Sequence, residues 1–336
     1  GFQEPRPEHP FAPYVRILGK GRTGTRSLSR GEAGDAFSMI LRGEVEPLQL
    51  GAFLMLLRVK EESPAELAGF VDACRAAMAP FPQQCRPDLD WSSYAGKRRQ
   101  HPWYLLSALL LSDMGYRVLM HGADGHTAGR LYSEQSMRQL GLPVAARVDD
   151  TAELLEEHGL CYTPLRTFLP ALHDIMQFRH LLGLRSPVNT LARLLNPAGA
   201  RCSIQSVFHP AYAALHQQAD QLLGQPRAMV FKGDSGEVEL KPHAETPVSL
   251  LANGCIQTVT WPRLQQDRPV PLPDISPAHL AAVWSGETRD VYGERALLAT
   301  AAAGLVCLDR AASPGDAMAM AESGWQSRKR ERLSCP

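Results

Sequence analysis

The alternation of strand-like and helix-like segments that begins near residue 88 is the feature that most constrains the fold. In chain order, the predicted segments are strand Leu89–Tyr94, helix Trp103–Met114, strand Tyr116–His121, helix Ser133–Leu140, helix Thr151–His158, a short strand near Cys161, and strands Cys202–Phe208 and Ala228–Lys232. Alternation of this kind is typical of parallel strands joined by helices that cover both faces of a sheet. We therefore predict an α/β domain with a mostly parallel central sheet, made of residues 81–169 and 197–336.

The chain before this alternation carries three helix patterns. Two of them begin with the spacing of a capping box, at Ser29-x-x-Glu32 and Ser63-x-x-Glu66. The third, Leu48–Arg58, is strongly apolar, and a small helical unit cannot bury all of it. We expect this helix to contribute to a homodimer interface.

A second helical region interrupts the α/β pattern at residues 170–196. It reads as two helices, Pro170–Leu182 and Pro187–Leu195, with no strand between them. We predict that this pair returns to the N-terminal helices. The result is a small discontinuous all-α domain, made of residues 1–80 and completed by 170–196, beside the α/β domain.

Local clusters of positive charge stand out because the formal net charge of the chain is zero. One cluster lies between residues 16 and 30, and the other is a triplet that precedes a predicted helix. The candidate phosphate-binding residues are Lys20, Arg22, Arg26, Lys97, Arg98 and Arg99. A helix N-terminus already favours anions, so the triplet is a candidate phosphate contact. The alternative is an ordinary solvated turn.

Other patterns in the sequence restrict the cellular compartment and the kinds of catalytic or metal site that the chain can contain. The seven cysteines include no CxxC pair, which argues against a zinc site or a disulfide framework and favours a reducing compartment. The apolar runs are too short to span a membrane, and the N-terminus lacks a signal-sequence pattern. We expect a cytoplasmic protein with no membrane partner. No spacing of serine, cysteine, histidine or carboxylate residues indicates a catalytic residue.

Four strings carry a resemblance to a known family. They are Leu48–Arg58 with Pro64–Phe70, His121-Gly122 after a strand, the segment from Arg179 and Arg185 through Asn189 to Pro197, and Gly233–Glu239. Together they resemble the anthranilate phosphoribosyltransferases and pyrimidine nucleoside phosphorylases, the third glycosyltransferase family. The resemblance implies the two-domain fold and the dimer. It also implies a substrate cleft at Gly96, His121, Gly122, Arg179, Arg185 and Asn189.

The same strings depart from the family pattern around the reaction centre. Tyr94–Arg98 replaces a Gly-Thr-Gly-Gly-Asp loop, Met120 replaces a lysine, Ala123-Asp124 replaces Asn-Arg, Ala192-Arg193 replaces Gly-Pro, and Val238 replaces a metal-binding aspartate. Glu239 remains as a weak metal candidate. Glycine amides wrap a pyrophosphate closely, and magnesium prefers carboxylate oxygens, so these changes weaken both functions. We predict no tight magnesium–phosphoribosyl pyrophosphate site and no cofactor.

A particular branch of the family shows similar departures. Ile17–Arg22, Arg26–Leu28 and Tyr94-x-Gly96-x-Arg98 resemble the YbiB-type proteins. This resemblance implies a catalytically degenerate homodimer that binds DNA or RNA, single- or double-stranded, without sequence preference. Two alternatives stay open. One is an active phosphoribosyltransferase or nucleoside-using glycosyltransferase with a non-anthranilate aromatic substrate, which would need magnesium. The other is a regulatory protein whose cleft senses a nucleotide.

Overall fold

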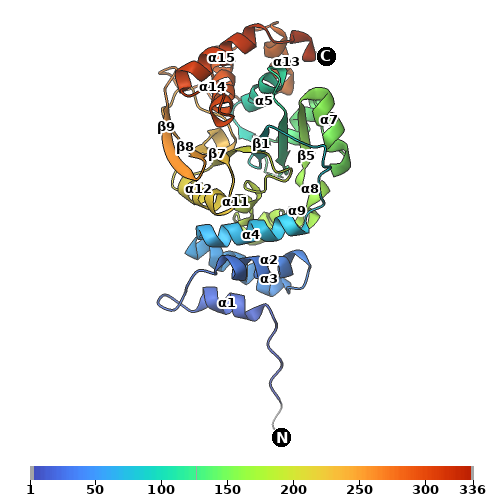
Figure 1. Cartoon of the computed structure of the whole chain (residues 1–336), viewed down its shortest axis with the longest axis vertical. Coiled ribbons are helices and arrows are strands. Elements are labelled where there is room, and N and C mark those ends of the chain that lie inside the picture. The colour runs from blue at the N-terminus through green and yellow to red at the C-terminus, as the bar shows by residue number, and fades with distance from the viewer. Residues whose placement is uncertain (1–3, 126, 334–336) are drawn as a thin grey trace.

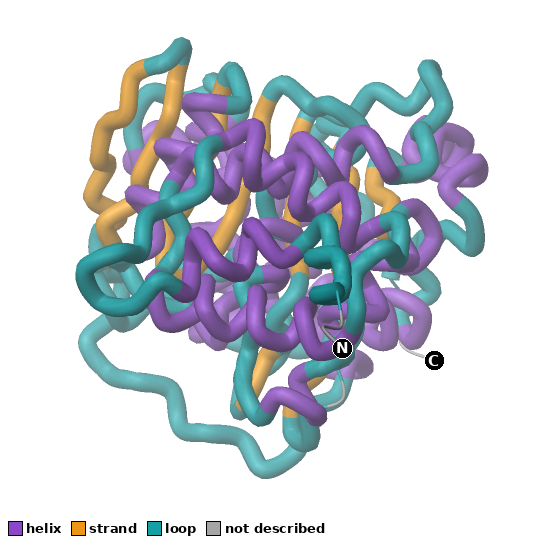
Figure 2. The backbone as a smooth tube through the Cα atoms, turned by 90° about the horizontal axis from the view of Figure 1, so that it is seen from below, coloured by secondary structure: helices purple, strands orange, loops and turns teal. Residues whose placement is uncertain are grey.

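A computed structural model describes residues 4–125 and 127–333, with a helical unit at one end and an α/β unit at the other (Figure 1). The N-terminal helices lie in layers below the sheet, and α4 is the layer that meets the α/β unit. Seen from below, these helices lie in front of the strands (Figure 2). Across the described ranges, no helix is both long enough and apolar enough to cross a membrane.

Four helices form the N-terminal layers: α1 (Ala12–Gly19), α2 (Arg30–Leu41), α3 (Pro47–Lys60) and α4 (Pro64–Ala77). Both predicted capping boxes are present, at Ser29 before α2 and at Ser63 before α4. Helix α1 was not predicted, because it lacks a side-chain cap and lies among proline and glycine residues. Its position depends on tertiary packing, in which the ring of Phe11 meets that of Phe53 at 5.1 Å.

The region around residues 170–196 packs with these N-terminal helices. It contains α8 (Leu165–Phe168), α9 (Pro170–Met176), α10 (Arg179–Leu182) and α11 (Val188–Ala192), and no strand. Leu172 and Leu191 belong to the same buried cluster as Phe53 and Phe70. One predicted helix, Pro170–Leu182, is in fact two, α9 and α10.

The central sheet has seven strands in the order β5-β3-β1-β6-β7-β8-β9. They are β1 (Leu89–Ser93), β3 (Val118–Gly122), β5 (Leu160–Pro164), β6 (Cys202–Val207), β7 (Arg227–Lys232), β8 (Thr246–Ala252) and β9 (Cys255–Trp261). The first five are parallel, which confirms the predicted fold class. The antiparallel β8–β9 hairpin was missed, although its Asn253-Gly254 turn is a recognised hairpin signal.

The helices that contribute to the main core of the α/β unit are α5 (Trp103–Asp113), α6 (Ser133–Gln139), α13 (Pro277–Ser285), α14 (Val291–Cys307) and α15 (Pro314–Gln326). Helix α7 (Thr151–His158) packs in a smaller cluster, and α12 (Tyr212–Leu222) packs in the cluster of the helical unit. Short 3₁₀ turns occupy Val148–Asp150, Asp234–Gly236 and Arg330–Arg332. Trp103 and Tyr104, at the start of the strongly apolar helix α5, are fully buried in this core. A second, two-stranded sheet pairs β2 (Lys97–Arg98) with β4 (Arg130–Leu131).

Candidate functional site

The loops that follow the parallel strands meet at one edge of the sheet. In parallel sheets, the crevice outside the carboxyl ends of the strands is the usual place for a ligand. Here a cavity of about 490 Å³ lies between these loops and helices α9 to α11. Its lining residues are Tyr94, Ala95, Ala123, Asp124, Gly125, Thr127, Tyr132, Met176, Gln177, Arg179, His180, Gly183, Arg185 and Asn189.

Lys97 does not face this cavity or the solvent. Its side chain is fully buried, and its ammonium group forms ion pairs with both Asp234 and Glu239. The β2–β4 pairing explains the difference from the expected exposed cation, because alternate residues of a strand point to opposite sides. Lys97 therefore points inward and Arg98 outward. The prediction that Lys97 contacts nucleic-acid phosphates is wrong.

The three charges of this buried group are interdependent. Burial lowers the pKa of Lys97, but the carboxylates of Glu239 and Asp234 outweigh that effect and the pKa is raised. Burial raises the pKa of Glu239 to about 7 even though Lys97 opposes the shift. Glu239 also accepts a hydrogen bond from the backbone N–H of Tyr104 at 2.9 Å. The ammonium group thus stands where a cation bound by these carboxylates would have to lie.

The backbone amides of the loop after β1 are hydrogen-bonded to Glu237. Its buried carboxylate accepts hydrogen bonds from the N–H groups of Ala95 and Gly96, both at 2.8 Å, and from Ser93 Oγ at 2.8 Å. Burial raises its pKa, while these donors act in the opposite direction. Gly96 has φ +78°, and a Cβ there would lie 2.9 Å from the Tyr132 ring. The amides that an external anion would use are therefore already bonded.

Arg98 and Arg99 are the exposed part of the basic triplet. Within the described ranges, neither guanidinium has a carboxylate within ion-pair distance. Their backbones are anchored instead: the Arg98 N–H donates to Ser235 Oγ at 3.2 Å, and the Arg99 carbonyl accepts from Leu272 at 2.9 Å. Anchored backbones with free cationic ends suit contact with phosphates.

Arg130 joins this group, although nothing in its sequence context indicated a role. One Nη1 donates to the carbonyl oxygens of Ala95, Gly96 and Ser235 at 3.0–3.2 Å, and so clamps the loop. Burial lowers its pKa, and the nearby cations Arg98 and Arg179 add to that shift. The charge of Arg130 is not neutralised by an ion pair within the described part of the chain.

The residues predicted for the cleft divide into two sets. Arg179, Arg185 and Asn189 line the cavity. Gly96, His121 and Gly122 are instead buried in the loop and strand that frame it. The His121 ring lies between the hydroxyl of Tyr94, at 2.6 Å from Nδ1, and the carboxylate of Asp90, at 3.2 Å from Nε2. These contacts join His121 of β3 to Asp90 of β1 and to Tyr94 in the loop that follows β1, which is a structural role typical of a buried histidine.

The basic N-terminal segment connects to the cleft through the end of α3. Lys20 and Arg22 are exposed, whereas Arg26 is engaged by Glu32 through two hydrogen bonds of 2.8 and 2.9 Å. Near that segment, Lys60 Nζ donates to the Oγ of Ser27 at 3.1 Å. On the same helix, Arg58 donates to the carbonyl of Arg185 at 3.1 Å.

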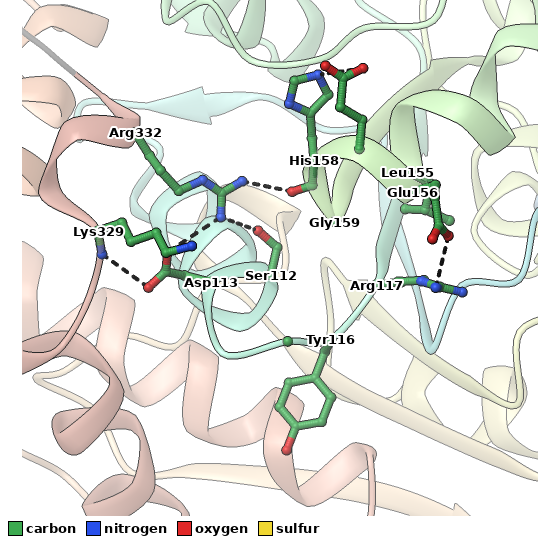
Figure 3. Close-up of a pocket in the computed structure, with 12 residues that line it drawn as sticks. Ser112, Asp113, Tyr116, Arg117, Leu155, Glu156, His158, Gly159, Lys329 and Arg332 are labelled. Carbon is green, nitrogen blue, oxygen red and sulfur yellow. Dashed lines mark hydrogen bonds and ion pairs between the residues drawn. The ribbon is translucent and has the colours of Figure 1, made fainter.

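A second large cavity, drawn in Figure 3, lies at the amino ends of β3 and β5, whereas the candidate site is at the carboxyl ends of the strands. It measures about 420 Å³, and residues just before β3 and β5 line it. Its arginines already have partners: Arg332 donates to Ser112 Oγ and the His158 carbonyl, both at 2.8 Å, and Arg117 pairs with Glu156 at 2.9 Å. Charges satisfied within the chain do not indicate a ligand.

The described residues offer no ready metal centre. Among residues 4–125 and 127–333, no three His, Cys, Asp or Glu side chains are placed to share a metal ion. The carboxylates of Asp234 and Glu239 are bridged by Lys97, and that of Glu237 is bonded to amides. The chain's residues therefore do not fit a magnesium ion at this turn in the arrangement described.

Comparison with known proteins identifies the family of the chain. A model described as the helical bundle domain of a glycosyl transferase family matches residues 14–78, and one described as its a/b domain matches residues 104–326. The chain belongs to this glycosyl transferase family. Its family relatives include an anthranilate phosphoribosyltransferase of Methylorubrum extorquens, 32% identical over 94% of each chain. Another is the uncharacterized protein YbiB of Escherichia coli, 30% identical over 72% of this chain and 76% of that protein.

Solved structures of the family have the same fold. Anthranilate phosphoribosyltransferase from Thermus thermophilus superposes with a TM-score of 0.77 at 26% identity, covering 96% of this chain and 94% of the other. The Saccharomyces cerevisiae enzyme, solved in complex with PRPP and Mg, gives a TM-score of 0.77 over 96% and 95% of the two chains. Its identity of 17% supports the fold alone.

Proposed function

We propose that this chain is a catalytically degenerate, phosphoribosyltransferase-like protein that binds DNA or RNA without sequence preference. The proposal depends on one observation about the cleft. Its backbone amides and carboxylates are bonded to other residues of the chain, whereas its arginines have no ion-pair partner among the described residues. Glu237 occupies the loop amides and Lys97 the carboxylates. In contrast, Arg98, Arg130, Arg179 and Arg185 have no ion pair within the described ranges. Unpaired cations of this kind favour a polyanion.

The proposed binding surface runs from the loop after β1 to the N-terminal segment. Arg98 and Arg99 lie at one end of it, and Lys20 and Arg22 at the other. The end of α3 contacts both the cleft arginines and the N-terminal segment. YbiB and anthranilate phosphoribosyltransferases match the chain with similar identity, so the proposed branch depends on the groups in the cleft described above.

We also propose that two copies pair through the helical unit. On α3, Leu48 and Val59 are each 85% exposed, although the rest of the helix contributes Phe53, Leu54 and Leu57 to the core. A dimer would place two basic surfaces in one particle and raise the affinity for a long polyanion.

Titration of fluorescent oligonucleotides tests the proposal. We expect single-stranded and duplex oligonucleotides of unrelated sequence to bind with similar affinity, and binding to weaken steeply as salt rises. Sedimentation of the same protein at micromolar concentration should give a dimer. In calorimetry, phosphoribosyl pyrophosphate with magnesium should give no saturable heat. Absence of oligonucleotide binding in this titration would overturn the binding proposal.

One observation favours an alternative function. The cleft keeps a cavity of about 490 Å³ that Arg179 and Asn189 line, as the family resemblance implies for a substrate site. An active enzyme would use phosphoribosyl pyrophosphate or a nucleoside with a non-anthranilate aromatic substrate. Saturable binding of phosphoribosyl pyrophosphate with magnesium would favour this alternative over the degenerate protein.

Two acidic residues near the cleft predict that oligonucleotide affinity depends on pH. Burial raises the pKa of Asp124 to about 6 and that of Glu62 to about 7, and both line cavities that contain Arg185. A carboxylate is neutral below its pKa, so acidification removes negative charge from beside the arginines. We expect oligonucleotide affinity at constant ionic strength to rise severalfold between about pH 8 and about pH 5.5.

Fluorescence anisotropy across this pH range checks the expectation. The double variant Asp124→Asn/Glu62→Gln serves as the control, because it should bind at high pH as the unmodified protein does at low pH. Affinity that stays flat in both proteins would show that these carboxylates do not face the bound polyanion.

A further inference from the structure

A smaller cavity adjoins the cleft and shares Arg185 and Asn189 with it. It measures about 200 Å³ and lies between the end of α3, helix α11 and the loop after β6. Cationic side chains enter it from three segments, as Arg58, Arg185 and Arg193. The hydroxyl-bearing residues Thr190 and Tyr212 also line it.

Arg193 is the unusual member of this group. It stands at the C-terminal end of α11 and is only 5% exposed. One Nη1 donates to the carbonyl of Ser206 at 2.6 Å, but no carboxylate among the described residues lies within ion-pair distance. The carboxylate that most affects it, Glu237, is already bonded to three other donors. Burying a guanidinium without a counter-ion is costly.

Arg185 adds a second uncompensated charge beside the first. Its guanidinium lies over the Phe208 ring, 3.7 Å from the centroid, and that of Arg193 lies 4.9 Å from the same centroid. Burial lowers the pKa of each arginine to about 10. For Arg185, repulsion by Arg193 adds to the shift. Stacking on one ring holds both guanidinium groups in place and limits their escape into solvent.

We propose that this cavity binds a phosphate dianion, free or as the phosphoryl group of a small phosphomonoester. Two adjacent guanidinium groups need two negative charges to be neutralised, and their planar forks match the oxygens of a phosphate. A carboxylate would neutralise only one of them. Glu61 and Glu62 also line the cavity, so the ligand has to be charged strongly enough to outweigh these acidic groups.

Arg193 distinguishes this site from the proposed nucleic-acid surface, with which the site shares Arg185. Arg98 and Arg99 do not line the smaller cavity, and a volume of about 200 Å³ suits a small molecule. Oligonucleotides without terminal phosphates should therefore bind equally well whether or not Arg193 is present.

Isothermal titration of the full chain at about pH 7.5 and constant ionic strength tests the site. The probes are sodium phosphate, phenyl phosphate and benzoate. We expect one phosphate per chain and comparable or tighter binding of phenyl phosphate, with benzoate much weaker. Arg193→Met should weaken phosphate binding roughly 10- to 100-fold. The matched control, Arg86→Met, removes an exposed arginine from the loop before β1 and should bind as the unmodified protein does.

A second variant keeps the test decisive if Arg193→Met folds poorly. Arg185→Met removes the partly buried cation of the pair and should cause a similar loss. Absence of phosphate binding by the unmodified protein would overturn the proposal, as would unchanged binding in either folded variant. Benzoate binding as tight as that of phosphate would overturn the assignment to a dianion. Phosphate binding without any oligonucleotide binding would leave this site in place and remove only the proposed function.

Discussion

The double variant Arg98→Gln/Arg99→Gln should bind oligonucleotides roughly 20-fold more weakly at physiological salt, about equally for every sequence. Both side chains are exposed and carry no ion pair in the described ranges, so their charge is available to phosphates. Each lost phosphate contact should lower the magnitude of the slope of log K against log salt by about 0.7 to 0.9. Base-reading arginines would instead lose preference at particular positions.

Glutamine is shorter than arginine but keeps a polar group that can donate hydrogen bonds, and it removes the positive charge of each side chain. The matched control is Arg86→Gln/Arg201→Gln, which removes the same charge from exposed positions before β1 and β6, at the opposite edge of the sheet. If both double variants weaken binding equally, net charge and not the loop determines affinity. Circular dichroism should show both proteins folded, because exposed substitutions usually change stability by less than about 0.5 kcal/mol.

Replacing Lys97 by methionine should lower the free energy of unfolding by about 3–5 kcal/mol near neutral pH. Methionine fills a similar volume, so the loss comes from leaving the Glu239 carboxylate buried without its cation. Guanidinium unfolding measures the effect. The control Arg42→Met breaks an exposed pair with Glu44, and this loss should leave the unfolding midpoint almost unchanged.

The sign of the pH dependence separates this cause from simple loss of packing. Removing Lys97 raises the folded-state pKa of Glu239 further, above its ordinary unfolded value. The folded variant then holds a proton that the unfolded chain has released, so its stability falls as pH rises through this window. The destabilisation should be smaller near pH 5 than near pH 8. An equal loss at both values would mean that Glu239 is not the cause.

Local signals in the sequence predicted most of the architecture. Capping boxes at Ser29 and Ser63 and the strand–helix alternation depend on neighbouring residues, and the structure contains both. The burial of Lys97 could not be predicted in this way. It depends on the β2–β4 ladder and on carboxylates about 140 positions away in the chain, and a basic triplet in a loop looks the same whether its first member points inward or outward.

Residues of the candidate site were equally hard to predict from local sequence signals. Arg193 was visible as a departure from the family pattern, but only the fold places it against Arg185 and Phe208. Arg130 carried no signal, because its role is to clamp a loop about 35 residues earlier in the chain. The proposed function depends on charged groups that long-range packing leaves without ion-pair partners, and periodicity in the sequence does not encode that.

The internal filling of the cleft by Glu237 and Lys97 has an evolutionary consequence. Removing the Glu237 carboxylate alone would orphan the N–H groups of Ala95 and Gly96, and removing Lys97 alone would orphan the Glu239 carboxylate. Under the proposed function, a return to an open substrate loop requires at least two coordinated substitutions, and an intermediate with only one of them leaves buried polar groups without partners. Because proteins have only about 5–15 kcal/mol of stability, such intermediates are readily lost to selection. If the chain is catalytically degenerate as proposed, these two side chains oppose a return to catalysis through single substitutions.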